Sequence, residues 1–224
     1  MPVLMLMLIT LLNDGTIMSI GYDNVIPIKT PEKWNIPALF FISSVLAAVT
    51  LSSSIFLLWI LLDSWNTNGV FHAFGMGGLS YGQVTTSIYL NVSVNAFLTL
   101  FSARCGDHFF WQSRPSNVVL GAAAFSFTCT TILALAWPAS YPDGIYTLGL
   151  AYRKPGPLFL WIWIYSIVWW LVQDAVKVYT FYLMEKYNWF GINDTGKLVL
   201  PESTLEYIRK NKERDMEAKV SGHH

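Results

Sequence analysis

Asn13, Asp14, Gly15 and Thr16 interrupt an apolar run that begins with "MPVLMLMLIT". An Asp at the centre of a membrane helix costs about 2.5–3.5 kcal/mol on insertion scales, and such residues are functional by default. Burial disfavours the charged form of a carboxyl group, so we expect Asp14 to accept a proton near neutral pH. Asn13 and Thr16 can hold a proton or water beside it. Gly15 is expected to unwind the helix, so that backbone carbonyls open toward a cavity. The alternative is that Asp14 lies near a membrane interface or bonds to a neighbouring helix.

Releasing a proton from such an acid requires a nearby cation, which favours the carboxylate. Residues 1–28 and 34–103 contain no Lys or Arg. Lys177 is expected to extend to the membrane surface beside Asp174, as an i,i+3 ion pair on a helix surface rather than a second proton site. The counter-charge for Asp14 is therefore expected outside this sequence.

A second group of polar residues recurs every four positions in the weakest apolar stretch and comprises Ser87, Asn91, Asn95 and Thr99. This stripe fits either one wall of an ion path or hydrogen bonding between packed helices. The second interpretation is favoured, because polar contacts between helices are common in membrane bundles.

Neither metal nor disulfide chemistry is indicated. Cys105 and Cys129 are too few and too far apart for a disulfide framework or a CxxC metal site. The four histidines also lack a ligand spacing: His72, His108, His223 and His224. We predict no metal site.

The composition indicates lipid as the solvent. The chain has 224 residues, of which 54% are hydrophobic and 12% charged, whereas soluble domains carry roughly 25% charged residues. The formal net charge of zero argues against a nucleic-acid partner.

The fold predicted from these features is an all-α, multi-span transmembrane bundle of about five helices. Each apolar run is near the ~20 residues that cross a bilayer. The predicted transmembrane domain covers 1–184, a C-terminal tail covers 185–224, and the spans lie at about 1–22, 36–62, 85–103, 117–137 and 157–183. A signal peptide is the disfavoured alternative for the first run, since no Lys or Arg precedes Lys29.

Charge predicts the orientation of the bundle. Of the 14 Lys and Arg residues, eleven lie after the first, third and fifth spans and Lys177 lies near the end of the fifth, whereas only Arg153 and Lys154 lie on the other side. Positive residues stay in the cytoplasm. The N-terminus is therefore expected outside, and the C-terminal tail in the cytoplasm.

Four stretches then carry a family resemblance. "LNDGTIMSIGYDN" with "KTPEKWN", followed by "IYLNVSV", "FFWQSRPS" and "LWIWIYSIVWWLVQDAVKVY", resembles the last five membrane helices of plasma-membrane proton-pumping P-type ATPases. Plants, fungi and protists carry these pumps, and the protist pumps are the most similar. The resemblance covers nearly all of residues 1–185. It implies a multi-pass protein of the plasma membrane, whose partners are the lipid bilayer and the proton.

The resemblance assigns Asp14 as the proton acceptor and donor of the pump. In the family, an Arg of the fifth helix and an Asn of the second assist this acid, and neither helix is present here. The DKTG phosphorylation motif, the nucleotide-binding domain and the actuator domain are also missing. The sequence therefore looks like a C-terminal fragment that is inactive alone. ATP and Mg would bind the complete pump, whose first five helices and cytoplasmic domains are the missing partner.

Two other classes of protein stay open. The first is a self-contained five-span structural or accessory membrane protein without transport of its own. The second is a small channel, which is weaker because one acid without a repeat gives no symmetric pore.

Overall fold

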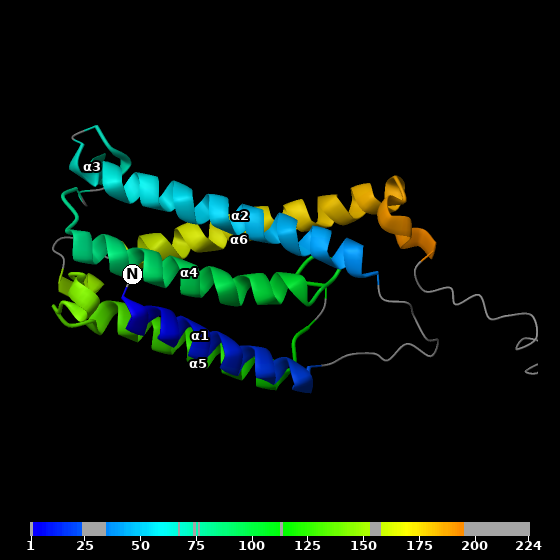
Figure 1. Cartoon of the computed structure of the whole chain (residues 1–224), viewed down its shortest axis with the longest axis horizontal. Coiled ribbons are helices and arrows are strands. Elements are labelled where there is room, and N and C mark those ends of the chain that lie inside the picture. Colours follow the sequence, from blue (N-terminus) through cyan, green and yellow to red (C-terminus); the bar gives the residue numbers. More distant parts are fainter. Residues whose placement is uncertain are drawn as a thin grey trace, which may run out of the picture.

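Five long helices run side by side in a single bundle (Figure 1). The computed structural model describes residues 2–23, 35–66, 68–73, 75, 77–112, 114–152 and 158–194. The long helices are α1 (Val3–Ser19), α2 (Ile36–Leu62), α4 (Tyr81–Ala103), α5 (Asn117–Ala136) and α6 (Leu158–Lys186). All five are long and apolar enough to cross a membrane, so the predicted fold class is confirmed.

The remaining elements are short and lie at the ends of the long helices. They are α3 (Val70–Ala73) and the 3₁₀ turns η1 (Ile20–Tyr22), η2 (Asp63–Trp65), η3 (Pro142–Gly144), η4 (Leu150–Tyr152) and η5 (Trp189–Asp194). Most of the predicted tail, from residue 195 onward, lies outside the described residues, as do Lys29, Lys33, Arg153 and Lys154.

Helix starts follow capping chemistry that hydropathy does not reveal. The predicted third span begins at 85, but α4 begins four residues earlier at Tyr81. Ser80 accepts a hydrogen bond from the Gln83 backbone, and the Gln83 side chain bonds back to the Ser80 backbone. This capping box satisfies backbone donors that would otherwise be unpaired. Ser116 caps α5 in a similar way, because its hydroxyl accepts from the Val119 backbone at 3.3 Å.

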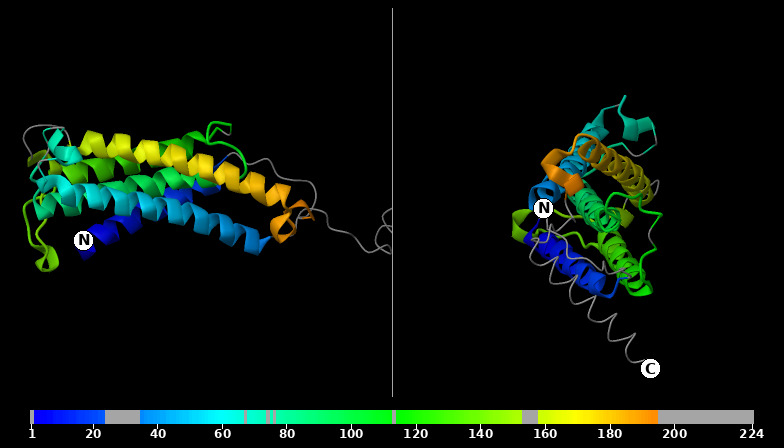
Figure 2. Two further views of the ribbon diagram at one scale, coloured as in Figure 1. Left: turned by 90° about the horizontal axis from the view of Figure 1, so that it is seen from above. Right: turned by 90° about the vertical axis from the view of Figure 1, so that its right-hand side faces the viewer.

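Helix α4 is the centre of the bundle. It packs against α1, α2, α5 and α6, while α1 packs on α5 and α2 packs on α6 (Figures 1 and 2). In the most apolar window of α4, 67% of the residues are buried, against 17–28% in the other four helices. The central position explains why α4 is the least apolar span: its polar side chains meet protein rather than lipid.

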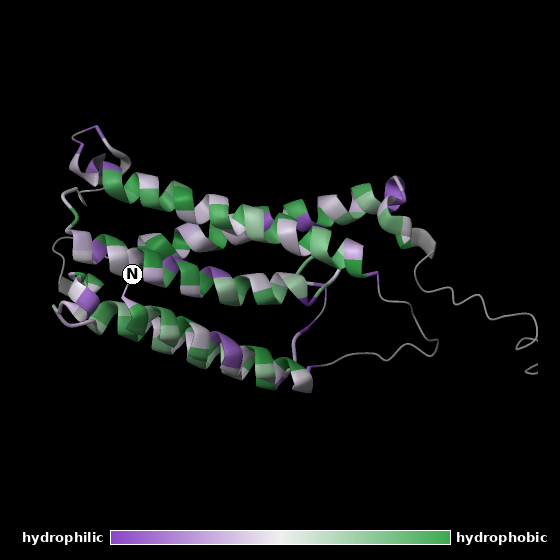
Figure 3. Ribbon diagram, viewed as in Figure 1, coloured by the Kyte–Doolittle hydropathy of each residue, from purple (hydrophilic) through white to green (hydrophobic). Residues whose placement is uncertain are grey.

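The outer helices consist largely of apolar residues along their length (Figure 3). Exposed large hydrophobic side chains include Phe40, Ile55 and Trp59 of α2 and Ile164 and Val168 of α6. In water, contiguous apolar surface of this extent marks an interaction site. Here it is the surface that a lipid bilayer or further helices would cover.

Candidate functional site

Asp14 lies on the outward face of α1, away from the rest of the bundle. Its side chain is exposed, and it lines a shallow groove with Leu11, Met7 and other residues of α1 only. Met7, Leu11 and Met18 of this face are 64–77% exposed. The spacing 7, 11, 14, 18 is the alternating 4–3 pattern with which one helix packs along another. Asp14 therefore lies on a face of α1 that no other described helix covers.

Thr16 points in the opposite direction from Asp14. It is 1% exposed, and its hydroxyl lies 2.7 Å from that of Ser126 on α5 while donating to the Leu12 carbonyl. Two residues along an α-helix turn the side chain by about 200°, so Thr16 and Asp14 cannot share one face. The expectation that Asn13, Asp14 and Thr16 form one group is thus corrected. Thr16 holds α1 to α5. Asn13 is half-buried, between the exposed face of Asp14 and the buried face of Thr16.

The expected unwinding at Gly15 is not found. Helix α1 is continuous from Val3 to Ser19, and a Cβ at Gly15 would meet nothing within 4 Å. One glycine costs a helix about 1 kcal/mol relative to alanine. That cost is too small to break a helix held at both of its ends.

Two carboxylates hold those ends. At the start of α1, the Val3 backbone N–H donates to Asp143 Oδ2 at 3.0 Å. Beyond its end, Asp23 pairs with Arg104 Nε at 2.7 Å and accepts from the Ser116 backbone at 2.9 Å. Both side chains of this ion pair are at least nine-tenths buried. The pair ties the helix that carries Asp14 to the α4–α5 linker (residues 104–116).

The polar stripe of α4 is buried in the middle of the bundle. Asn91 donates to Ser54 of α2, and its Oδ1 accepts from Asn95 and from Ser166 of α6, all at 3.1–3.3 Å. Thr99 exchanges hydrogen bonds with Gln173 of α6 at 3.0–3.2 Å. Asn91 and Thr99 thus make the interhelical bonds that the sequence favoured.

Ser87 is different from its neighbours in the stripe. It is fully buried, and its hydroxyl has no hydrogen-bond partner among the described residues. Asn95 bonds to Asn91 of its own helix. The stripe therefore combines bonds across helices with local ones.

The Asp174–Lys177 pair was expected on the helix surface and is instead buried, which corrects that expectation. Both side chains are 1% exposed and lie 2.9 Å apart. Lys177 also donates to the Ser102 and His108 carbonyls at 2.9 and 2.7 Å. Asp174 accepts from the Ser102 hydroxyl and the Phe110 backbone at 2.6 and 3.2 Å. Lys177 does not extend to the membrane surface, because the α4–α5 linker folds back over it.

Sequence reasoning missed two buried ion pairs next to the linker, Asp23–Arg104 and Asp174–Lys177. Each charge was visible at the end of an apolar run, as with Asp23, Arg104 and Lys177. Their partners include the Ser116 amide and the His108 carbonyl of the linker, and the course of a linker is not encoded in hydropathy.

Among the described residues, Asp14 is the acid of a long helix that has neither a hydrogen bond nor an ion pair. Asp174 is neutralised, and Asp23 is paired beyond the end of α1. The described residues contain no group of three or more His, Cys, Asp or Glu that could hold a metal ion. The geometry therefore leaves Asp14 on a face of α1 that the described part of this chain does not cover.

Comparison with known proteins agrees with this geometry. The chain is 47% identical over 198 residues to two proteins of Leishmania donovani, probable proton ATPase 1A and probable proton ATPase 1B. It is 25% identical over 213 residues to a probable plasma membrane ATPase of Dictyostelium discoideum. Each match covers 85% of this chain and 20% of the relative. No protein-family model matches the chain.

The homologues of this chain are thus proton and plasma-membrane ATPases, and the five-helix apolar bundle is consistent with the C-terminal membrane region of a P-type ATPase. The resemblance expected from the sequence is confirmed. The chain spans about a fifth of the length of the curated relatives it matches. It is a multi-pass membrane protein whose similarity lies with the membrane region of ion-pump ATPases.

Proposed function

We propose that this chain is part of the membrane domain of an ATP-driven proton-exporting pump in the plasma membrane, and that Asp14 binds the transported proton. The observation that carries the proposal is the outward position of Asp14 on a bundle that is 47% identical to probable proton ATPases. An accessory protein would have no need of an acid at that position.

The proposed chemistry needs a partner helix on the outer face of α1. Contact with that helix would enclose Asp14 away from solvent. A cation that approaches from the partner then favours the carboxylate and releases the proton to the other side. Residues 1–28 and 34–103 contain no Lys or Arg, so the cation comes from the part of the pump beyond this chain. ATP, Mg and the phosphorylation site belong to that part as well.

Asn13 and Thr16 have different parts in this proposal. Asn13 is half-buried next to Asp14, from where its amide can bond to water or to the partner helix. Thr16 is bonded to Ser126, and it keeps α1 in the rotation that turns Asp14 outward. Ser87, Asn91, Asn95 and Thr99 lie on the central helix, where Asn91 and Thr99 hold neighbouring helices through hydrogen bonds.

A chimaera tests the proposal. The matching fifth of Leishmania donovani probable proton ATPase 1A is replaced by this chain, and ATP-driven acidification is measured in reconstituted vesicles. We expect proton uptake by the chimaera, and neither uptake nor ATP hydrolysis by this chain alone. The matched control is the same ATPase truncated before the replaced segment. A chimaera that is folded and inserted, yet transports no protons, contradicts the proposal.

The orientation of the bundle is proposed from charge and has its own test. Asn193-Asp194-Thr195 is an acceptor pattern for N-glycosylation, and glycosyl transfer occurs only on the lumenal side. We expect Asn193 to stay unmodified when the chain is expressed with microsomes, because the tail is cytoplasmic. A glycosidase-sensitive mobility shift that is absent from Asn193→Gln would show that the tail is lumenal and would contradict the proposed orientation. Asn91-Val92-Ser93 matches the same pattern but is buried in α4 and is not expected to react.

A further inference from the structure

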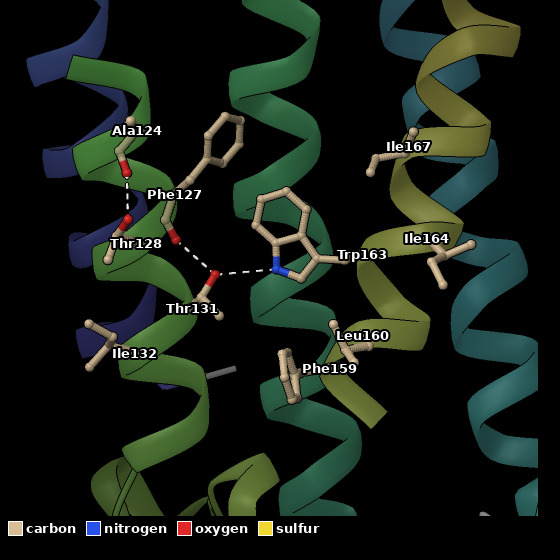
Figure 4. A pocket seen from close by; sticks show the side chains of 10 residues that line it. All are labelled: Ala124, Phe127, Thr128, Thr131, Ile132, Phe159, Leu160, Trp163, Ile164 and Ile167. Atoms are coloured by element: carbon tan, nitrogen blue, oxygen red, sulfur yellow. Dashed lines mark hydrogen bonds between the residues drawn. The ribbon is translucent and has the colours of Figure 1, made fainter. Parts of the chain in front are cut away.

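Helix α5 carries four hydroxyl groups, and three of them are hydrogen-bonded. Thr128 and Thr131 line the groove between α5 and α6, where they donate to carbonyls of their own helix at 2.7 and 2.8 Å (Figure 4). Ser126 lies 2.7 Å from the Thr16 hydroxyl of α1. Thr130 is the exception, because it is fully buried and its hydroxyl has no hydrogen-bond partner among the described residues.

Two further hydroxyls without partners face Thr130 from α4. Tyr89 and Ser93 are 0% and 1% exposed, and neither hydroxyl is hydrogen-bonded within the part of the chain that the structure describes. The two residues are one turn apart, so they share a face of α4. Ser93 and Thr130 both approach the Tyr89 hydroxyl. Three unpaired hydroxyls from two packed helices therefore gather at one point inside the bundle.

The number and type of these groups match the needs of a buried water molecule. Buried polar groups are nearly always hydrogen-bonded, and the pressure to bond is greater where lipid surrounds the protein. Each of the three hydroxyls can both donate and accept, yet they approach one another without forming a hydrogen bond of ordinary geometry. A buried water typically makes about three hydrogen bonds to such groups.

A cation fits this site less well than water does. Three neutral hydroxyls do not compensate the cost of burying a charge. The carboxylates of Asp23 and Asp174, whose side chains are buried, are paired with Arg104 and Lys177, and Asp14 is exposed on the outer face of α1. The site therefore suits a small neutral molecule that both donates and accepts hydrogen bonds.

We propose that Tyr89, Ser93 and Thr130 bind one water molecule, which joins α4 to α5 through hydrogen bonds to the three hydroxyls. Ser126 lies one turn before Thr130 on α5, roughly 6 Å along the helix axis, and is bonded to Thr16. With the water in place, polar contacts near these positions connect α1 to α5 and α5 to α4. The proposal does not depend on proton transport by the pump.

X-ray radiolysis of the purified full chain in detergent, followed by mass spectrometry of its peptides, tests the site directly. Radiolysis turns a bound water into a hydroxyl radical, which oxidises the aromatic ring beside it. We expect Tyr89 to be oxidised at least tenfold faster than Phe97, a buried aromatic of α4 that packs on Phe127. The double variant Ser93→Ala/Thr130→Val should lower the Tyr89 rate to that of Phe97, whose own low rate shows that the variant is folded. Equal rates for Tyr89 and Phe97 in the unmodified chain, or a Tyr89 rate that the double variant leaves unchanged, would overturn the proposal.

Unfolding by denaturant distinguishes a bridging water from hydroxyls that bond to nothing. Thr130→Val and Tyr89→Phe each remove one hydroxyl and keep the shape of the side chain. We expect each variant to lower the unfolding midpoint, and the two together to lower it little further, because either change breaks the same bridge. The matched control is Ser87→Ala, which removes a buried, unpaired hydroxyl from another face of α4 and should not lower the midpoint. Removing a hydroxyl that truly bonds to nothing is neutral or stabilising, so an unchanged or raised midpoint in Thr130→Val would overturn the proposal, as would additive losses in the double variant.

Discussion

Asp14 and Asp174 are two carboxylates on membrane-spanning helices with opposite surroundings. Asp174 is 1% exposed and accepts hydrogen bonds from Lys177, Ser102 and Phe110. Asp14 is exposed and has no hydrogen bond or ion pair among the described residues. A neutralised acid with every oxygen bonded stabilises a structure, whereas an acid on an uncovered face is available to a partner. The comparison teaches that burial, rather than position within a span, separates an acid that holds the bundle together from one that is left uncovered by this chain.

The largest loss of stability is expected when Asp174 loses the neighbouring charge of Lys177. Lys177→Met leaves Asp174 buried without its counter-charge, and breaking a buried ion pair in this way costs about 3–5 kcal/mol. We expect the purified chain in detergent to unfold at a much lower denaturant concentration. The control is the double variant Asp174→Leu/Lys177→Met, which leaves no unpaired charge and should recover most of the loss. If the double variant lost as much stability as the two single substitutions together, the ion pair would not act as one stabilising interaction.

A smaller effect is expected at the centre of the polar stripe. Asn91→Leu removes three hydrogen bonds, to Ser54, Asn95 and Ser166. Each interhelical bond in a membrane contributes about 0.6 kcal/mol on average, so a loss of about 1–2 kcal/mol is expected in the same unfolding measurement. Ser87→Ala is the matched control, since the Ser87 hydroxyl has no partner among the described residues. If Asn91→Leu unfolds like the unmodified chain but abolishes transport in the chimaera, the stripe is a wall of the ion path.

The smallest effect on stability is expected at Asp14 itself. Asp14→Asn changes a side chain that contacts nothing across the bundle, and exposed substitutions of this kind stay within about 0.5 kcal/mol. The unfolding midpoint of the chain in detergent should therefore match that of the unmodified protein. A marked loss of stability would show that Asp14 has a structural role inside this chain, and the contrast with Asp174 would fail.

Much of the fold was predictable because lipid imposes simple rules. The length and apolarity of each run predicted the five spans, and the polar interruptions of residues 85–103 pointed to helix contacts. The direction of Asp14 was not predictable from its own position. It depends on Thr16 bonding to Ser126, 110 residues away, which fixes how α1 is rotated.

The burial of Lys177 could not be predicted from the sequence for a related reason. Near the end of a helix, a lysine ordinarily extends to the membrane surface. Here the carbonyls of Ser102 and His108 and the carboxylate of Asp174 satisfy all three of its donors. The Ser102 and His108 carbonyls lie 75 and 69 residues from Lys177 in the sequence, so local pattern could not bring them together.

The most direct test of the central claim is proton transport by the Asp14→Asn chimaera beside the unmodified chimaera. Asparagine has the shape of aspartate but cannot carry a titrating proton. Acidification of reconstituted vesicles is followed after ATP addition, at equal amounts of inserted protein. We expect no proton uptake by the Asn variant at unchanged insertion. Uptake at the rate of the unmodified chimaera would contradict the assignment of Asp14 as the proton-binding residue.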